Sequence, residues 1–238
     1  MNIETVIAEL AHAKSVDGLS KLLFDWRNQS GVAHLIYHAT YAPLSKDLRP
    51  LVLCTYDPAW VARYTEKDYF SIDPVLLAGR EETLPIDWIT VDHETDQARR
   101  FFVEAESYGV GRHGFTLPIR GPFGERALFT FTTNETDHRW HKARYEYLRD
   151  FALVSHYLHD RAMQLASLRP DFKIRQLSRR ERQCLHHLAR GAPPGRIARQ
   201  LNLSASAVRQ YLKGASRKLG CTTIEEIAVK ASLLGFGR

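Results

Sequence analysis

The fold of the C-terminal part of the chain is decided by residues 177–220, which read LSRRERQCLHHLARGAPPGRIARQLNLSASAVRQYLKGASRKLG. Ser178, followed three residues later by Glu181, has the spacing of a capping box, a pattern that begins a helix. Apolar residues then recur at helical spacing, and nothing after residue 177 predicts a strand. A three-residue turn at 202–204 separates the second and third of four short helices, and the last begins after Thr222 or Thr223. This arrangement predicts an all-α, four-helix domain of the helix-turn-helix type.

The third of these helices, which begins after Ser204, has two different faces. The residues that we expect to be buried are Val208, Leu212, Ala215 and Leu219. The polar residues that lie largely outside this stripe, and that we expect to contact DNA, are Ser206, Arg209, Gln210, Lys213 and Arg217. Arginine and glutamine suit bidentate contact with guanine and adenine, so this helix is predicted to enter the major groove. Lys218, near the helix end, is predicted to contact a phosphate. The alternative is a small helical bundle whose basic face is merely solvated.

Charge is distributed unevenly along the 238 residues, whose formal net charge is +6. Residues 173–238 contain 14 Lys and Arg against 3 acidic residues, a net +11, and the rest of the chain carries a net −5. The sign changes close to Pro170, which cannot continue a helix. We therefore expect a larger domain at 1–168, a linker at 169–176 and a basic domain at 177–238. A basic module on a mildly acidic body indicates that only the C-terminal part meets a polyanion.

The basic segment resembles the C-terminal DNA-binding domain of LuxR-type transcription regulators. Glu181, Leu185 and Gly191 match three of the most constant positions of that family. Three departures stand out. The usual Lys-Ser after Gly191 is replaced by residues 192–195, Ala-Pro-Pro-Gly, and the usual Thr-Val and His of the third helix are Ala207-Val208 and Tyr211. The departures affect the start of the second helix and one phosphate contact rather than the fold.

The N-terminal part combines helices with short aromatic strands. The strands are expected at 34–41, 51–56, 115–119 and 127–133. The helices are expected at two places within the first 30 residues, after Asp57-Pro58, after Asp73-Pro74, at 96–108 and, as one long helix, at 138–168. This order predicts an α+β fold, an α/β/α sandwich with a central antiparallel sheet.

Six positions of this part form a recognisable set: Trp60, Tyr64, Asp73, Pro74, Trp88 and Gly114. In their order and spacing they resemble the autoinducer-binding domain of the quorum-sensing regulators that bind N-acyl-homoserine lactones. Taken singly, the aromatic residues are more typical of a core and Asp73 of a helix N-cap. Only the joint pattern favours a ligand site.

The chemistry of such a ligand suits these residue types, and the individual roles rest on the resemblance. The indole N–H of Trp60 would donate to the lactone carbonyl, and Asp73 would accept from the amide N–H. Tyr56 would donate to the acyl carbonyl with Thr130 as a second partner, while Tyr64 and Trp88 would pack against the lactone ring. The other residues expected around the ligand are Ile36, His38, Val75, Phe115, Thr116 and Leu128. His38 and Thr40 on one strand face favour a short, branched or aryl acyl group.

Other sequence signals do not support an enzyme, a metal site or a cofactor. Residues 109–114 satisfy the string GxGxxG, but a helix precedes them and a strand follows, the reverse of a dinucleotide site. Cys54, Cys184 and Cys221 are far apart and lack metal-ligand spacing, and no nucleophile motif is present. No apolar run is long enough to span a membrane, and the start of the chain does not resemble a secretory signal.

The sequence therefore predicts a cytoplasmic, ligand-responsive transcription factor. The family resemblance implies that it is an activator. Its expected ligand is an N-acyl-homoserine lactone, and it would bind a two-fold related promoter site on double-stranded DNA as a homodimer formed through the helix at 138–168. RNA polymerase is the expected further partner. Two other interpretations stay open: a LuxR-type regulator that responds to a different small molecule or to none, and an enzyme that modifies the lactone.

Overall fold

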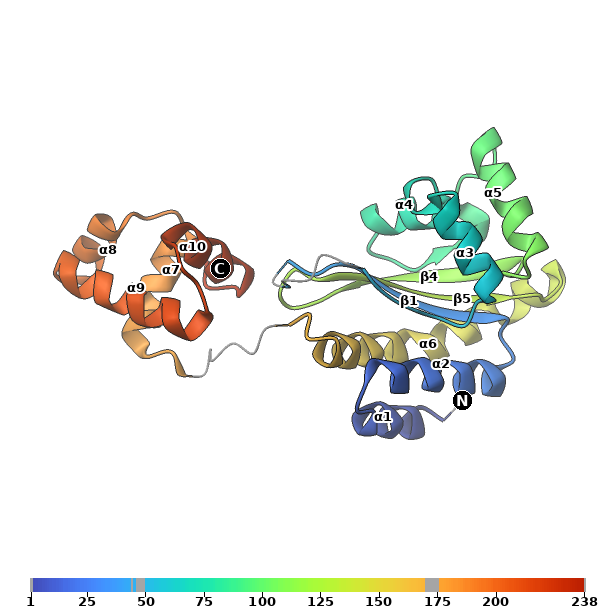
Figure 1. The fold of residues 1–238 in the computed structure, drawn as a ribbon, viewed down its shortest axis with the longest axis horizontal. Coiled ribbons are helices and arrows are strands. Elements are labelled where there is room, and N and C mark those ends of the chain that lie inside the picture. The colour runs from blue at the N-terminus through green and yellow to red at the C-terminus, as the bar shows by residue number, and fades with distance from the viewer. Residues whose placement is uncertain (1, 44, 46–49, 170–175, 238) are drawn as a thin grey trace. The chain divides into compact units, whose positions relative to one another are not determined.

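The computed structural model describes residues 2–43, 45, 50–169 and 176–237. The chain divides into two compact units, the larger of which ends at Arg169. This division falls beside Pro170, where the charge of the sequence changes sign. The linker predicted at 169–176 lies mostly outside the described residues. Figure 1 shows a mixed helix-and-sheet unit and a wholly helical one.

The larger unit is built on a five-stranded antiparallel sheet in the order β2-β1-β5-β4-β3. The strands are β1 (His34–Tyr41), β2 (Leu51–Cys54), β3 (Ile86–Asp87), β4 (His113–Arg120) and β5 (Arg126–Thr133). Because side chains alternate along a strand, each strand presents one row of residues to each face of the sheet. The two faces of this sheet serve different purposes.

One face of the sheet carries the main core of the larger unit. It is covered by three helices (Figure 1): α1 (Ile3–His12), α2 (Val16–Ser30) and α6 (Asp137–Leu165). Tyr37, Phe129 and Phe131 project from the strands and pack with Trp140 and Phe151 of α6, all fully buried. This aromatic layer is closely packed and fixes the sheet as a rigid platform.

The opposite face is covered by shorter elements. They are α3 (Pro58–Glu66), α4 (Pro74–Glu81) and α5 (Asp96–Ser107), with the 3-10 helices η1 (Tyr69–Ser71) and η2 (Trp88–Thr90). Both Asp-Pro pairs begin a helix as predicted, since Asp57 accepts from the N–H of Ala59 and Asp73 from that of Val75. Helices on both faces of an antiparallel sheet confirm the predicted α/β/α sandwich.

The smaller unit consists of α7 (Arg179–Ala189), α8 (Pro194–Leu201), α9 (Ala205–Leu219) and α10 (Ile224–Leu233). The capping box of Ser178 and Glu181 is present, Ser204 caps α9, and Thr223 rather than Thr222 caps α10. The short turn between α8 and α9 has Asn202 in the left-handed conformation. The predicted four-helix, helix-turn-helix fold is confirmed.

Some element boundaries differ from the prediction, and one short strand was not predicted. The strand expected to reach residue 56 ends at Cys54, and the long helix expected to reach residue 168 ends at Leu165. The two-residue strand β3 was not predicted, because so short an edge strand has no period to detect. Among the described residues, no helix is long and apolar enough to cross a membrane.

Candidate functional site

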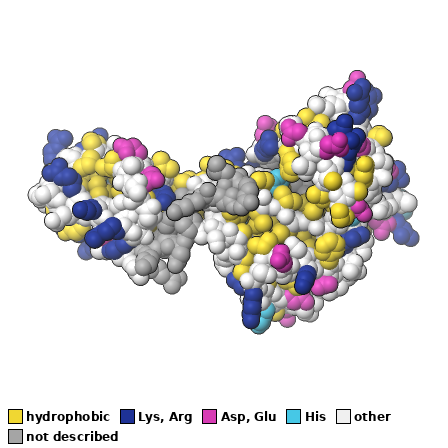
Figure 2. Space-filling view, viewed as in Figure 1, with side chains coloured by type: hydrophobic (Ala, Val, Ile, Leu, Met, Phe, Trp, Pro, Cys, Tyr) yellow, Lys and Arg dark blue, Asp and Glu magenta, His cyan; other side chains and the backbone are white. Residues whose placement is uncertain are grey.

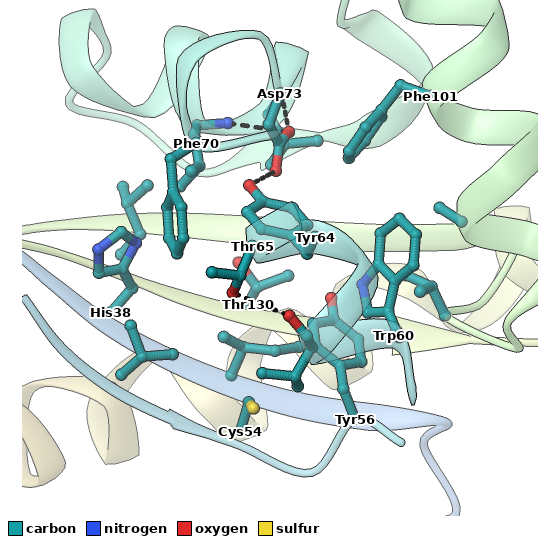
Figure 3. A pocket seen from close by; sticks show the side chains of 18 of the residues that line it. His38, Cys54, Tyr56, Trp60, Tyr64, Thr65, Phe70, Asp73, Phe101 and Thr130 are labelled. Atoms are coloured by element: carbon teal, nitrogen blue, oxygen red, sulfur yellow. Dashed lines mark hydrogen bonds between the residues drawn. The ribbon is translucent and has the colours of Figure 1, made fainter. Parts of the chain in front are cut away.

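A cavity of about 110 Å³ lies between the sheet and the helices α3, α4 and α5 (Figure 3). It is many times larger than the roughly 10–15 Å³ that accommodates one water, so it can hold an organic molecule. Twenty residues line it: Ile36, His38, Val52, Cys54, Tyr56, Trp60, Val61, Tyr64, Thr65, Phe70, Asp73, Val75, Leu76, Trp88, Phe101, Phe102, Ala105, Val110, Leu128 and Thr130. Most of these side chains are apolar, and the few polar atoms determine what the cavity can bind.

The floor of the cavity is formed by the pocket-facing rows of β1 and β5. Ile36 is paired with Thr130, and His38 with Leu128. Since all four side chains project to the same face, they follow one another along the floor. Thr130 therefore lies nearer to Trp60 and Tyr56, and His38 lies toward Phe70 (Figure 3).

Asp73 caps the start of α4 and also lines the cavity. Its Oδ1 accepts from the backbone N–H of Val75 at 2.8 Å and of Leu76 at 3.3 Å, and its Oδ2 accepts from the Tyr64 hydroxyl at 2.7 Å. A carboxylate oxygen can accept more than one hydrogen bond, so Oδ2 retains capacity for a further donor. Burial raises the pKa of Asp73 above its usual value, and the three hydrogen bonds oppose that rise only in part.

Two hydrogen-bond donors face the cavity without a partner. Neither the indole N–H of Trp60 nor the hydroxyl of Tyr56 makes a hydrogen bond with any part of the chain that the structure describes. Burial, together with nearby Asp73, raises the pKa of Tyr56 well above its usual value, so its phenol is protonated and can donate. Trp60 is held in place by edge and tilted contacts with Tyr64 and Phe101. A buried donor without a partner is costly, and a bound ligand would satisfy it.

A chain of hydrogen bonds orients a third donor, Thr130. The indole N–H of Trp88 donates to Oγ1 of Thr116 at 3.0 Å, and that oxygen lies 2.8 Å from Oγ1 of Thr130. Thr116 is fully buried, so its own hydroxyl proton is satisfied by donating to Thr130. The proton of Thr130 is then left for the cavity. Trp88 consequently offers the cavity its ring but not its N–H.

The glycine of the predicted set is explained by close packing. A Cβ atom added to Gly114 would lie 2.8 Å from the carbonyl oxygen of Phe131 and 3.0 Å from the indole of Trp88. Only a residue without a side chain lets the Trp88 ring lie flat against β4. Gly114 therefore positions Trp88 and does not itself contact the cavity.

The structure brings ten of the twelve predicted ligand residues together at the cavity: Ile36, His38, Tyr56, Trp60, Tyr64, Asp73, Val75, Trp88, Leu128 and Thr130. Thr116 lies directly behind Thr130. Phe115 is placed elsewhere, because the residue next to Thr116 on β4 projects to the opposite face, where Phe115 packs against Phe131 and Trp140. The expectation that Phe115 faces the cavity is thus corrected. Thr40 lies outside the cavity as well, and donates to the carbonyl of Arg126.

Several lining residues were not predicted from the sequence. Phe70, Phe101 and Phe102 contribute much of the apolar wall, and Cys54 and Val52 come from the edge strand β2. The helical spacing of Phe101 and Ala105 marks an inward face of α5, but it does not distinguish a cavity from a core. Phe70 lies in a single 3-10 turn, which has no periodic signal.

The second candidate site is the exposed face of α9. All five polar residues predicted to contact DNA are exposed: Ser206, Arg209, Gln210, Lys213 and Arg217. The predicted apolar stripe is buried: Val208, Leu212, Ala215 and Leu219. Figure 2 shows Lys and Arg side chains distributed over the smaller unit. Arg196 and Arg199 on α8 are also exposed. They were not predicted, although the first helix of such a motif commonly crosses the phosphate backbone.

Lys218 does not belong to this exposed face. Its ammonium group lies 2.7 and 2.9 Å from the two carboxylate oxygens of Glu181 and also donates to the carbonyl of Gln176. The phosphate contact of Lys218 stays a prediction, and in this structure its charge is paired with that of Glu181 inside the unit. Glu181 also accepts from the N–H of Ser178 at 2.6 Å, and Gly214 leaves room for its carboxylate, since a Cβ there would lie 2.5 Å from Oε1.

Within the described residues, no group of three or more His, Cys, Asp and Glu side chains could hold a metal ion. The residues at 109–114 connect the end of α5 to β4, and Gly109 and Gly111 both have positive φ. They form a helix-to-strand turn rather than a phosphate-binding loop.

Comparison with known proteins matches both units. Residues 15–162 match the autoinducer binding domain family, and residues 175–231 match the family of bacterial regulatory proteins called the luxR family. The transcriptional activator protein RaiR of Rhizobium etli is 47% identical over 180 residues, covering 76% of this chain and 74% of RaiR. The transcriptional activator protein VanR of Vibrio anguillarum is 28% identical, covering 97% of this chain and 95% of VanR.

Solved structures share the fold along the whole chain. Escherichia coli SdiA superposes with a TM-score of 0.69 at 19% identity, covering 98% of this chain and 96% of that one. A structure of SdiA in complex with octanoyl-rac-glycerol gives the same TM-score and identity and covers 93% of that chain. At this level of identity the likeness concerns the fold.

Proposed function

The chain belongs to the luxR family of bacterial regulatory proteins with an autoinducer-binding domain, and from this premise we propose that its ligand is an N-acyl-homoserine lactone. Its relatives are transcriptional activators rather than enzymes. The ligand-bound protein would bind promoter DNA as a homodimer and regulate transcription in the cytoplasm, with RNA polymerase as its further partner.

The proposal rests on the polar atoms of the cavity. Trp60, Tyr56 and Thr130 offer donors, and Asp73 offers an acceptor, in surroundings that are otherwise apolar. An acyl-homoserine lactone carries two carbonyl acceptors and one amide N–H donor, together with an apolar tail. The lactone carbonyl would accept from Trp60, the acyl carbonyl from Tyr56 and Thr130, and the amide would donate to Asp73. Every polar group of the ligand would then have a partner, as burial requires.

The exposed face of α9 supports the DNA-binding part of the proposal. Arg209 and Gln210 lie in the first half of α9, the part that a helix-turn-helix places against base edges, and Lys213 follows one turn after Arg209. Arg217 lies further along, and Arg196 and Arg199 on α8 are available for phosphates. A pair of such helices about 34–36 Å apart would match a two-fold related site.

An apolar stripe on α6 supports the homodimer. Tyr145, Leu153 and Tyr157 have exposed fractions of 62%, 48% and 43% on a helix whose other side is buried in the core. Leu153 and Tyr157 are one turn apart and therefore adjacent. We expect Leu153→Glu to convert the dimer to a monomer in sedimentation velocity. Val103→Glu on α5, where the native side chain is 70% exposed, is the matched control and should leave the dimer intact.

A second candidate ligand is favoured by one observation. SdiA, which shares the fold, has been solved in complex with octanoyl-rac-glycerol, an acyl ester without an amide N–H. Such a ligand could use the donors of the cavity but would leave Asp73 without a new partner. Dependence of binding on Asp73 therefore separates the two ligand classes.

The test uses the purified full chain with acyl-homoserine lactones of graded tail length and with octanoylglycerol. At a concentration about 100 times its Kd, a lactone should stabilise the protein by roughly 2.7 kcal/mol and raise its melting temperature. It should also increase affinity for promoter DNA in fluorescence anisotropy. If octanoylglycerol stabilises the protein and no lactone does, the second candidate is correct. If no compound of either class has an effect, the proposed ligand gating is wrong.

A further inference from the structure

The pairing scheme above leaves the imidazole of His38 unused. His38 lies on the floor of the cavity, two residues along β1 from Ile36, and is only 9% exposed. In Figure 3 its imidazole lies next to Phe70, on the far side of the cavity from Trp60. The ring contacts Phe70 edge-on, with 5.8 Å between the centroids. His38 therefore projects into the part of the cavity away from the lactone-binding donors.

The imidazole of His38 makes no hydrogen bond with any described residue. The other buried histidines all have polar partners. His34 lies 2.8 Å from the carbonyl of Thr55 and 2.9 Å from that of Gly109, His113 lies 3.0 Å from a carboxylate oxygen of Asp137, and His159 lies 2.8 Å from the Tyr37 hydroxyl. Buried polar groups are normally paired, and because the unpaired imidazole of His38 lines a cavity, a molecule in that cavity can supply its partner.

We propose that His38 is a specificity-determining residue that selects a ligand with a hydroxyl or keto oxygen on its acyl chain. The inference rests on the proposed function and deepens it, since it specifies the class of acyl group. It adds an oxygen atom to the expected short, branched or aryl tail.

Geometry along the sheet places His38 opposite the acyl chain. Thr130 is paired with Ile36 and would bind the acyl carbonyl, and His38 lies one step further along β1, about 7 Å away along the strand. The acyl chain that leaves the carbonyl in this direction passes Ile36 before it reaches His38, beside which Leu128 and Phe70 lie. Ile36, Leu128 and Phe70 are apolar and offer an oxygen on the chain no partner, whereas the imidazole of His38 offers one.

The protonation state of His38 fits either form of oxygen. Burial, and to a lesser extent the charge of Arg80, lowers its pKa to about 4, so the ring is neutral near pH 7. A neutral imidazole has one N–H donor and one bare nitrogen acceptor. A hydroxyl group can pair with whichever nitrogen faces the cavity, whereas a keto group needs the N–H. We therefore expect hydroxylated ligands to bind at least as tightly as keto ligands.

The experiment compares octanoyl-homoserine lactones that differ only in oxygenation. The probes are the unsubstituted compound, the 3-oxo compound and compounds with a hydroxyl group at carbon 3, 5 or 7. In the native chain, the best oxygenated ligand should bind about tenfold more tightly than the unsubstituted one by isothermal titration calorimetry. In His38→Leu this preference should disappear or reverse, and in His38→Gln, which keeps a donor and an acceptor, it should be partly retained.

A matched control separates polarity from shape. Ile36→Val changes the floor of the cavity one step away without adding or removing a polar atom, so it should alter all affinities by a similar factor. If the native chain binds the unsubstituted lactone as tightly as every oxygenated one, or if His38→Leu keeps the preference, the role of His38 is wrong while the proposed function stands. If no lactone binds the native chain at all, the proposed function fails and this inference fails with it.

Discussion

Each unit of the protein buries a carboxylate at the start of a helix, and the pKa values of the two carboxylates shift in opposite directions. Asp73 caps α4 in the larger unit, and burial raises its pKa despite three hydrogen bonds. Glu181 lies in the capping box of α7, and although burial alone would raise its pKa, Lys218 and Ser178 hold it below the usual value. The internal charge of the smaller unit is thus balanced by its own residues, and that of Asp73 is not.

This difference reflects what each unit must do. The smaller unit presents exposed cations on α9 and α8, and the charge of its buried Glu181 is paired with Lys218. In the interior of the larger unit, polar atoms of Trp60, Tyr56 and His38 face the cavity and form no hydrogen bond with the residues that the structure describes. An unpaired buried donor or acceptor lowers the stability of the ligand-free protein, and a ligand that pairs with it recovers that free energy. Strongly shifted pKa values often accompany such sites.

The largest effect is expected from removing Asp73. Asp73→Ala should weaken binding of the lactone by about 100-fold, because a hydrogen bond to a charged group contributes roughly 1.5–3 kcal/mol. Isothermal titration calorimetry measures this loss. The matched control is Asp57→Ala, which removes the same Asp-Pro cap from α3 at an exposed position outside the cavity. Both variants should lose about 1 kcal/mol of stability as a helix cap is lost, but Asp57→Ala should keep its ligand affinity. Equal losses of affinity would contradict the assigned role.

A smaller effect, confined to the other unit, is expected from Glu181→Gln. It leaves the ammonium group of Lys218 without its carboxylate, and breaking a buried ion pair costs about 3–5 kcal/mol. Because Lys218 is 32% exposed, we expect a loss nearer 2 kcal/mol. Hydrogen–deuterium exchange should show reduced protection of peptides from residues 176–237 and no change in residues 2–169. Loss of protection around the cavity would mean that the two carboxylates are not independent.

A loss of about 1–3 kcal/mol in specific DNA binding is expected from Arg209→Ala, with ligand affinity unchanged. Lys218→Gln is the informative comparison, because Lys218 is already paired with Glu181 and has no free charge to offer a phosphate. It should affect stability more than the salt dependence of DNA binding. If Lys218→Gln lowers the slope of log affinity against log salt as much as Lys213→Ala does, its pairing with Glu181 does not persist on DNA.

The comparison also shows what the sequence could and could not predict. Periodicity and caps located both folds, because Ser178, Ser204, Asp57 and Asp73 each begin a helix by local hydrogen bonding. The family resemblance, now confirmed, located most of the cavity. Whether a strand residue faces the cavity depends on register, and a shift of one residue reverses it. Phe115 was assigned to the cavity for this reason, although it faces the core.

Side-chain pairing over long distances was beyond the sequence. Lys218 and Glu181 are 37 residues apart, and nothing in either segment predicts that one neutralises the other. The lack of a partner for His38 could not be predicted either, since His34 on the same strand is hydrogen-bonded and nothing in the sequence distinguishes the two. Both features result from packing between segments, which determines the charges that remain available.

The smallest expected effect is the pH dependence that His38 gives to the stability of the larger unit. The pKa of His38 is lowered to about 4 from its usual 6.5, because burial disfavours the charged ring. Between these values the unfolded chain binds more protons than the folded one, so stability falls as pH falls. From pH 6.5 to pH 5 the contribution of His38 amounts to about 1.5 kcal/mol, and His34, whose pKa is also lowered by burial, acts in the same direction. The pKa of Glu181 is also lowered, but for a carboxyl group this favours the charged form. Its stabilising effect therefore persists until the pH falls below about 4.5.

Thermal unfolding of the native chain and of His38→Leu at pH 6.5, 5.75 and 5 measures this contribution directly. The difference in stability between the two proteins should grow in favour of the variant as pH falls. A ligand that pairs with the neutral ring should enlarge the pH dependence, since protonation would then also remove an acceptor from the complex. If the two proteins lose stability equally as pH falls, the imidazole is solvated in the folded state. His38 would then not be one of the buried, unpaired polar groups of the larger unit.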